Sequence, residues 1–400
     1  MSEWKTYKIG DICKRVCSGG TPRSTEPSYY DGDIPWLNTK EINFNRIYST
    51  ERCISQKGLD NSSAKWINAN CVIVAMYGAT AAKVAINKIP LTTNQACCNL
   101  FIDENIADYR YVYYWLCTNY TELASLANGG AQQNLNAQQI KDFEISLPPL
   151  AEQRRIAGIL GAIDDKIENN RRINTNLELQ AQALFDEWLC KVNTIKGTFN
   201  DIIDATLAGD WGQETLQGNY THEVYCIRGA DIPALRNGDK GKMPIRYILE
   251  RNYLVKQLRA NDIVVEISGG SPTQSTGRVC MITKSLLDRL GKDVVCTNFC
   301  RAITPKNGYA IFIFLYWQML YNKNTMFSYE NGTTGIKNLN IADLISKEPI
   351  NVPKQEDVDK LNVVLQPIYD QIYANGLQNE TLATLRDTLL PKLMSGELIL

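Results

Sequence analysis

The sequence predicts an α+β fold in which two pseudo-symmetric globular domains are separated by two long helices that pair as an antiparallel coiled coil. Two observations lead to this prediction. The tripeptide Asn-Leu-Asn at residues 134–136 recurs at residues 338–340, a displacement of 338 − 134 = 204 in a chain of 400 residues. A long hydrophobic seam with heptad spacing follows each copy. A repeat of half the chain far exceeds the ~20 to 50 residues of a solenoid unit, so it indicates two similar domains.

The two globular domains, which we call heads, share one order of elements. A buried-strand pattern at residues 71–76 has its counterpart at 263–268, and an aromatic helical stretch around Trp115 has its counterpart around Trp317. Strands mixed with a few helices are typical of an α+β domain. The expected divisions are residues 1–147 for the first head, 148–196 for the first spacer helix, 197–352 for the second head and 353–400 for the second spacer helix.

The two spacer helices carry polar residues at matched positions of their seams. Apolar residues recur at alternating steps of three and four at positions 156, 160, 163, 167, 177, 181, 184 and 188, and again at 361, 365, 368, 372, 382, 389 and 393 with Arg386 among them. Asn170 and Asn174 interrupt the first seam, and Asn375 and Asn379 interrupt the second.

Asparagine at a seam position lowers the stability of a coiled coil but specifies its register and partner. If the helices run antiparallel with their midpoints aligned, Asn170 faces Asn379 and Asn174 faces Asn375. We therefore expect two buried asparagine pairs in a rod of roughly 50 Å, from about 33 residues at 1.5 Å each. The alternative is that each helix packs only on its own head.

Composition narrows the class of protein. The net charge is −1, from 42 basic and 43 acidic residues, which argues against a protein that coats nucleic acid through bulk charge. The 12 cysteines form no C-x-x-C pair and His222 is the only histidine, so we expect reduced thiols and no metal site. No apolar run approaches 18 residues and the first residues do not resemble a signal peptide, so no membrane span and a cytoplasmic location are expected.

The chain offers little catalytic chemistry. No Walker A pattern is present, and a single histidine leaves no well-supported Ser/His/Asp or Cys/His arrangement. Asp262 and Glu266 lie on one strand pattern, but no lysine follows in the arrangement of a metal-dependent nuclease. We therefore expect no catalytic residues, and we interpret His222 as incidental.

Several phrases together resemble the DNA specificity subunits of type I restriction-modification enzymes. They are LPPLAEQRRIAGILGAIDDKI at 147–167, SGGTP at 18–22, DIPW at 33–36, IRGADI at 227–232 and LPKLMSGE at 390–397. The resemblance extends over essentially the whole chain. The second copy departs from the first, because Val-Pro-Lys-Gln-Glu at 352–356 replaces the Pro-Pro-Leu form.

The resemblance implies a reader of double-stranded DNA that is not itself an enzyme. Two target-recognition domains would each read one half of a split DNA target, and the coiled coil would fix the gap. Two modification subunits, which carry adenine methyltransferase activity and bind S-adenosylmethionine, would bind to the long helices. Restriction subunits, using ATP and magnesium for translocation and cleavage, would join them, and this chain would bind no cofactor. The alternative from another class is a structural adaptor whose heads bind proteins.

Candidate DNA contacts are polar side chains on loops beside apolar strands, because Arg and Lys suit guanine whereas Asn and Gln suit adenine. In the first head they are Ser18, Thr21, Arg23, Lys40, Tyr77, Thr93, Asn94 and Gln95, and in the second Arg228, Thr273, Gln274, Arg278, Asn298 and Lys337. Asn298 is included because Thr297-Asn298 matches Thr93-Asn94.

Each group of candidates has a structural alternative. Asn94 would instead cap a turn, and residues 18–21 would form an ordinary turn. Residues 269–278 would be a flexible solvent loop. Arg228 and Lys337 would be members of surface ion pairs.

Overall fold

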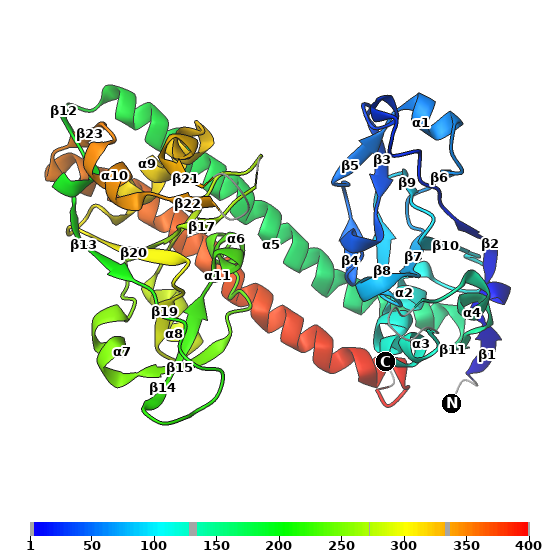
Figure 1. Ribbon diagram of the computed structural model, residues 1–400. Coiled ribbons are helices and arrows are strands. Elements are labelled where there is room, and N and C mark those ends of the chain that lie inside the picture. The colour runs from blue at the N-terminus through cyan, green and yellow to red at the C-terminus, as the bar shows by residue number, and fades with distance from the viewer. Residues whose placement is uncertain (1–3, 128–133, 272, 333–336, 399–400) are drawn as a thin grey trace. The chain divides into compact units, whose positions relative to one another are not determined.

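The computed structural model describes residues 4–127, 134–271, 273–332 and 337–398. It divides into two compact units, Met1–Asp165 with Thr384–Leu400, and Lys166–Ala383 (Figure 1). Each unit consists of one head and part of both long helices, so the units are described separately. The four-part division by residue number stays a prediction.

The first head contains a five-stranded sheet of order β2-β10-β7-β8-β4, a four-stranded sheet of order β5-β3-β9-β6 and the pair β1-β11. Its strands are β1 (Lys5–Lys8), β2 (Cys13–Ser18), β3 (Ile34–Leu37), β4 (Asn45–Ile47), β5 (Arg52–Ile54), β6 (Trp66–Ile67), β7 (Val72–Ala75), β8 (Val84–Asn87), β9 (Leu91–Thr93), β10 (Cys97–Ile102) and β11 (Glu144–Leu147). Its helices are η1 (Ile9–Ile12), η2 (Pro27–Tyr29), η3 (Thr39–Glu41), α1 (Gln56–Asp60), η4 (Gly78–Thr80), α2 (Tyr109–Thr118), α3 (Tyr120–Ser125) and α4 (Ala137–Asp142).

The central strand β7 is buried on both faces. Val72 and Val74 pack in a core with helix α2, whereas Ile73 and Ala75 pack in a second core that includes Leu37 of β3. Because successive side chains of a strand point to opposite faces, a strand covered on both sides needs a continuous apolar run. This double burial explains the uninterrupted hydrophobic pattern at residues 71–76.

The second head contains sheets of order β13-β20-β16-β18, β15-β14-β19 and β17-β22-β21, with the pair β12-β23. Its strands are β12 (Thr194–Gly197), β13 (Ile203–Ala208), β14 (Tyr220–Ile227), β15 (Ile245–Leu249), β16 (Ile263–Glu266), β17 (Ser268–Gly269), β18 (Val279–Met281), β19 (Val294–Cys296), β20 (Cys300–Pro305), β21 (Glu330–Asn331), β22 (Lys337–Leu339) and β23 (Ile350–Pro353). Its helices are η5 (Phe199–Asp201), η6 (Gly229–Asp231), α6 (Ile232–Arg236), α7 (Glu250–Lys256), α8 (Lys284–Leu290), α9 (Ala310–Asn322), η7 (Thr325–Tyr329) and α10 (Ile341–Lys347).

The predicted pseudo-symmetry is confirmed by strand topology. The run β2-β10-β7-β8 of the first head corresponds to β13-β20-β16-β18 of the second, with antiparallel pairing throughout. The parallel pair β3-β9 corresponds to the parallel pair β14-β19. The buried helix α9 takes the place of α2.

The repeated Asn-Leu-Asn joins the end of the central strand to a helix in each head. Its first asparagine pairs with the second residue after the central strand, Tyr77 in one head and Ser268 in the other. Its leucine is buried, and the leucine N–H donates at 2.8 Å to the carbonyl of Met76 or of Ile267.

The last asparagine of each copy caps a helix. Asn136 accepts a hydrogen bond from the N–H of Gln139 at the start of α4, and Asn340 accepts one from the N–H of Asp343 at the start of α10. Asparagine is among the preferred N-cap residues. The tripeptide therefore recurs because pairing, burial and capping each require one of its residues.

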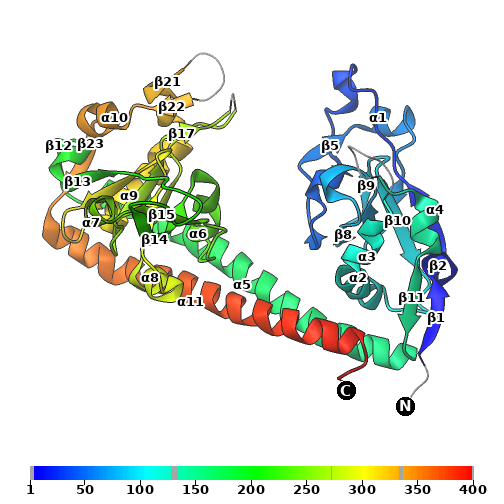
Figure 2. The ribbon, with the colours of Figure 1, turned by 60° about the horizontal axis from the view of Figure 1, so that its bottom comes forward.

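The two long helices, α5 (Leu150–Lys191) and α11 (Gln355–Met394), pack antiparallel within each unit (Figure 2). In the second unit Asn170 Nδ2 donates to Asn379 Oδ1 at 2.9 Å, and Asn375 Nδ2 donates to Asn174 Oδ1 at 2.7 Å. All four side chains are buried. Both expected pairs are thus formed, while their control of register stays a prediction.

The seam departs from strict heptad spacing near the end of α5. Leu184, expected in the seam, is 41% exposed, whereas Phe185 is fully buried. Phe185 lies 5.6 Å from the ring of Phe312 and 6.3 Å from that of Tyr316, both in α9. The prediction for Leu184 was wrong because this end of α5 packs on α9 of the second head. In addition, a straight helix repeats every 3.6 residues instead of 3.5.

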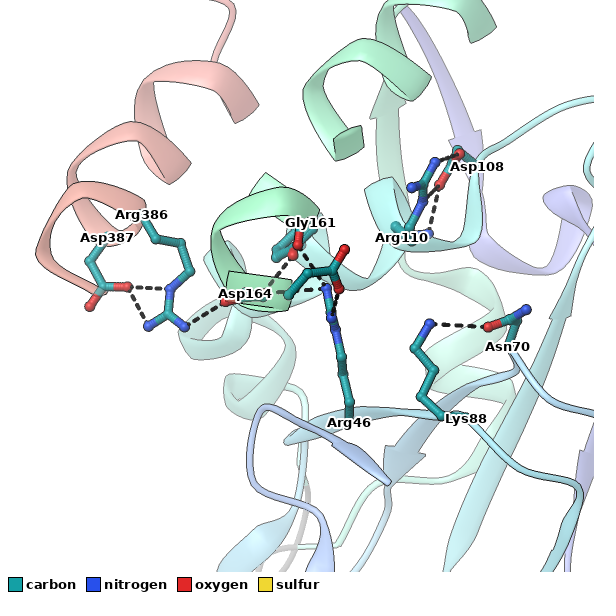
Figure 3. A network of polar contacts seen from close by, with 11 residues as sticks. Arg46, Asn70, Lys88, Asp108, Arg110, Gly161, Asp164, Arg386 and Asp387 are labelled. Carbon is teal, nitrogen blue, oxygen red and sulfur yellow. Dashed lines mark hydrogen bonds and ion pairs between the residues drawn. The ribbon is translucent and has the colours of Figure 1, made fainter. Parts of the chain in front are cut away.

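A network of charged residues explains why Arg386, a cation, is found in the otherwise apolar second seam. In the first unit Arg386 donates to Asp164 at 2.9 Å, and Tyr114 donates to the same carboxylate at 2.5 Å. Figure 3 shows Arg46 of β4 directed at the same segment of α5, where it pairs with Asp165 and donates to the Gly161 carbonyl at 3.4 Å. Burial lowers the pKa of Arg386, but hydrogen bonds to Asp164 and Asp387 outweigh it and raise the pKa. The network ties head and helices together within this unit.

Candidate nucleic-acid interface

The turn between β9 and β10 is the best-supported site in the first head. Gly20 N–H donates to the Thr93 carbonyl at 2.8 Å, and Trp36 Nε1 donates to the Gly20 carbonyl at 2.9 Å. A side chain at Gly19 would place its Cβ against the Thr93 carbonyl, far closer than real Cβ atoms come to another atom. Glycine at position 19 is therefore required for the backbones of the two loops to touch.

Thr93 and Asn94 hold this turn from the inside. Thr93 is fully buried, and its hydroxyl accepts from Asn99 Nδ2 at 2.9 Å. Asn94 is 7% exposed, and its Oδ1 accepts from Ala96 N–H and from Cys97 Sγ, both at 3.1 Å. The structure therefore gives Asn94 Oδ1 the turn-capping role, and the side-chain oxygens of both residues accept hydrogen bonds inside the protein.

Gln95 is the exposed residue of the turn, and other candidates gather around it. The Thr21 hydroxyl donates to Gln95 Oε1. Ser18 pairs with Cys98 at the end of β2, and Tyr77, 43% exposed, follows Met76, whose N–H donates to the Ala96 carbonyl at 2.8 Å.

The remaining two candidates of the first head differ in their contacts. Arg23 is exposed, and its guanidinium has no hydrogen bond or ion pair within the described part of the chain. Lys40 lies in η3, is exposed and pairs with Glu51. Among the residues described, no hydrogen bond or ion pair joins the Lys40 side chain to the turn.

In the second head the predicted loop folds on itself. Ser271 N–H donates to the Gln274 carbonyl at 2.7 Å, and the Ser271 hydroxyl accepts from the N–H groups of Thr273 and Gln274 at 3.3 and 3.0 Å. The far end of the loop is anchored by Thr276, whose N–H and hydroxyl donate to Glu330 at 2.6 and 2.9 Å. Thr273 and Gln274 are left exposed at the tip. Pro272, which the prediction includes in this loop, lies outside the described residues.

Three predicted cationic readers instead pair with buried carboxylates. Arg278 binds Glu266 with two hydrogen bonds of 2.7 and 2.6 Å. Arg228 binds Asp231 in the same way at 2.9 and 3.1 Å. Lys337 lies 2.9 Å from Glu330. For Arg228 and Lys337 these contacts match the alternative that each residue belongs to an ion pair. For Arg278 the contact with Glu266 corrects the expectation that its guanidinium is directed at DNA.

The physical reason is the cost of burying a charge. Glu266, Asp231 and Glu330 have side chains no more than 6% exposed, and a buried carboxylate needs a partner of opposite charge. Burial raises the pKa of Glu330, but hydrogen bonds from Lys337 and Thr276 hold it below its ordinary value. The three cations therefore position the loops of the second head.

Asn298 does not correspond to Asn94 of the first head, contrary to the prediction from the sequence comparison. The parallel pairing aligns Thr93 of β9 with Leu37, and Cys296 of β19 with Ile227. The next residues, Asn94 and Thr297, donate their N–H groups to those same two carbonyls. Asn94 therefore corresponds to Thr297, and the displacement here is 297 − 94 = 203. The predicted match of Thr93-Asn94 to Thr297-Asn298 was wrong by one residue, so Asn298 corresponds to Gln95.

Sequence reasoning missed two residues of this region. Phe299 is 59% exposed beside Asn298, and its carbonyl accepts from the N–H groups of Ile267 and Ser268 at 2.9 and 3.2 Å. Glu266 anchors Arg278. A carboxylate inside an apolar strand is a signal that a cation lies nearby, and it could have identified that pair.

His222 lies between two carboxylates on the surface of the second head. Its Nδ1 is 2.6 Å from Glu250 and its Nε2 is 2.8 Å from Asp293, and the ring stacks on Tyr253 at 3.9 Å. Burial lowers the pKa of His222, but the hydrogen bonds to Asp293 and Glu250 outweigh it and raise the pKa above its ordinary value.

We expect an NMR titration to give His222 a pKa above ~6.5. It is the only histidine, so its ring signal is unambiguous. A raised folded-state pKa stabilises the fold below the unfolded-state pKa, and this stabilisation is lost as pH rises through the folded-state value. The Asp293→Asn variant should lower the pKa. A wild-type pKa at or below 6.5 would contradict the carboxylate clamp.

Two general features bear on function. In the described ranges no group of His, Cys, Asp and Glu is arranged to hold a metal ion. None of the helices in those ranges has the length and hydrophobicity that crossing a membrane requires.

Fold and site together define a two-headed recognition protein, with two versions of one α+β head joined to paired helices and polar turns at corresponding places. Residues 1–179 match the family model of the type I restriction modification DNA specificity domain. This first part of the chain is therefore similar to the DNA specificity domain of type I restriction-modification enzymes.

Individual relatives show the same similarity. The chain is 28% identical to the type I restriction enzyme MjaIX specificity subunit of Methanocaldococcus jannaschii, over 99% of this chain and 94% of that one. It is 21% identical to the HindI specificity subunit of Haemophilus influenzae over the full length of both. The crystal structure of the type I S subunit from M. genitalium has the same fold, with a TM-score of 0.55 and 17% identity over 98% of this chain and 96% of that one.

Proposed function

We propose that this chain is the sequence-specific DNA-binding subunit of a type I restriction-modification complex. Each head reads one half of a bipartite duplex target, and the antiparallel helices set the gap between the half-sites. The observation that carries the proposal is the duplicated head, whose scaffold is repeated while the exposed loop residues differ. Such a molecule fits two different half-sites presented to equivalent surfaces.

Two linked binding sites can give high total affinity even if each head binds its half-site only weakly. Once one head binds, the second binds at the effective concentration set by the helices, which raises the total affinity without new contacts. A net charge of −1 leaves few charges for phosphate binding, so partner subunits would supply much of the backbone contact.

The readers we propose are the exposed or partly exposed polar candidates that form no ion pair with a neighbouring carboxylate. They are Ser18, Thr21, Arg23, Tyr77 and Gln95 in the first head and Thr273, Gln274 and Asn298 in the second. Arg228, Arg278 and Lys337 act through the loops that they hold. Lys40 remains a candidate phosphate contact, because its pair with Glu51 is exposed and therefore weak.

We propose no catalytic role for this chain. Two modification subunits with S-adenosylmethionine would methylate adenine, and restriction subunits with ATP and magnesium would translocate and cut DNA. The second unit's part of the long helices exposes apolar residues, which support protein docking there. They are Leu179, Val363, Val364 and Leu377, each more than half exposed.

The gap between half-sites provides the test. The purified complex with modification subunits is titrated against its target duplex and against duplexes with one to three base pairs inserted in the gap. Each inserted pair moves one half-site by ~3.4 Å and rotates it by ~35°. We expect binding at least about 100-fold weaker with two inserted pairs, since only one head can engage.

The controls separate the proposal from its rival. Changing the same number of base pairs inside the gap without altering its length should leave binding unchanged. Tolerance of the insertions would contradict the fixed-gap reader. Absence of any sequence-specific binding would favour the protein-binding adaptor.

A further inference from the structure

The turns β9–β10 and β19–β20 are two copies of one structure. Gly20 N–H donates to the Thr93 carbonyl and Asp210 N–H donates to the Cys296 carbonyl, both at 2.8 Å. On the far side of each turn, Met76 N–H donates to the Ala96 carbonyl at 2.8 Å and Ile267 N–H donates to the Phe299 carbonyl at 2.9 Å. Residues 93–97 therefore correspond one by one to residues 296–300.

Both turns are closed in the same way. Cys97 N–H donates to the Asn94 carbonyl at 3.2 Å, and Cys300 N–H donates to the Thr297 carbonyl at 2.9 Å. In each, the side chain of the capping residue also contacts the sulfur of the cysteine three positions on, Asn94 to Cys97 at 3.1 Å and Thr297 to Cys300 at 3.7 Å.

A glycine lies against each turn where no side chain fits. A Cβ at Gly19 would strike the Thr93 carbonyl, and a Cβ at Gly209 would strike the Thr297 carbonyl. The backbone of each turn is thus held by hydrogen bonds on both sides and by a close contact beneath. A side chain on such a support is presented with little freedom, which precise recognition requires.

Each turn presents a carboxamide. Gln95 and Asn298 occupy the same position and are exposed, while the capping residues before them are buried. Thr21 donates its hydroxyl to Gln95 Oε1, which orients the amide, and Gln95 Nε2 forms no hydrogen bond with any of the described residues. A carboxamide combines a donor and an acceptor, the pair that matches N7 and N6 of adenine in the major groove.

We propose that Gln95 and Asn298 are the same reading position in the two heads and that each binds one adenine, one per half-site. This inference rests on the proposed function. It adds that the two half-sites share an A·T pair at corresponding places, although their other bases differ. The two reading surfaces differ at the next position. Phe299 of the second head is exposed, whereas its counterpart in the first head, Ala96, is buried.

The test combines protein and base substitutions in the complex with modification subunits. Gln95→Leu and Asn298→Leu remove the amide while keeping side-chain bulk, and a panel of duplexes carries each base pair at every target position. We expect each variant to lose about 10- to 100-fold of its preference for A·T at one position, in one half-site only. Gln138→Leu, which changes an exposed glutamine of α4, should alter no preference.

The adenine is tested by replacing it with 7-deazaadenine, which lacks the N7 acceptor. The replacement should weaken wild-type binding and have no further effect on the matching leucine variant. Unchanged base preferences, or equal weakening on every sequence, would overturn the adenine assignment while leaving a specific wild-type complex intact. A wild-type complex without sequence preference would instead overturn the proposed function, and this inference with it.

Discussion

The Glu266→Gln variant is expected to lower the free energy of unfolding by about 2 to 3 kcal/mol. The wild-type carboxylate is nearly buried and receives two hydrogen bonds from Arg278. Glutamine keeps the shape but leaves the guanidinium without its counter-charge. The effect falls below the ~3 to 5 kcal/mol of a fully buried pair because the Arg278 side chain is 24% exposed.

Denaturant unfolding measures this loss, with Glu187→Gln as the control. Glu187 pairs with Lys191 on the surface of α5, where both side chains are more than 60% exposed, so its loss should leave the stability nearly unchanged. The double variant Glu266→Gln with Arg278→Met should recover part of the stability, since no buried charge remains unpaired. Equal effects of the two single variants would contradict the anchoring role of Glu266.

Gly376→Ala is expected to destabilise the protein by about 2 to 3 kcal/mol. Gly376 lies on α11 where the helix meets the loop after α6, and an alanine Cβ there would overlap the Gly238 carbonyl. The obstacle is backbone, which cannot rotate away. Asn174 also donates to the Asn237 carbonyl at 2.9 Å, so the loop is fixed to the helices on both sides of the contact.

Gly158→Ala in α5 is the matched control. A Cβ at that position meets nothing within 4 Å, and alanine is favoured over glycine inside a helix by about 1 kcal/mol. Thermal unfolding should therefore show opposite shifts for these two glycine-to-alanine changes. A Gly376→Ala protein as stable as wild type would show that the loop does not rest on this helix.

Much of the fold was predictable because the sequence contains clear periodic patterns. The asparagine pairs, the burial of β7 and the matching topology of the heads follow from heptad spacing and from repeated phrases. Leu184 was misplaced because the heptad pattern describes helix–helix contact, whereas Phe185 packs against α9. The local periodicity of a helix does not predict a contact such as this one, which joins segments that are distant in the sequence.

The site was predictable only in part, for two physical reasons. Arg228, Arg278 and Lys337 looked like free cations because a sequence does not show which carboxylates become buried beside them. The second turn was misaligned by one residue because Thr-Asn occurs in both heads at different positions of the same structure. Backbone hydrogen bonds, absent from sequence patterns, were needed to pair Gln95 with Asn298.

In the proposed function, two heads on one chain read two separated half-sites. The most direct measurement is a genome-wide map of methylated adenine in DNA from cells that carry this chain together with its modification subunit. We expect a split motif with a single fixed gap, and exchange of residues in the turn 93–97 should change only one half of the motif. A contiguous motif, a variable gap or methylation without any motif would contradict the proposed function.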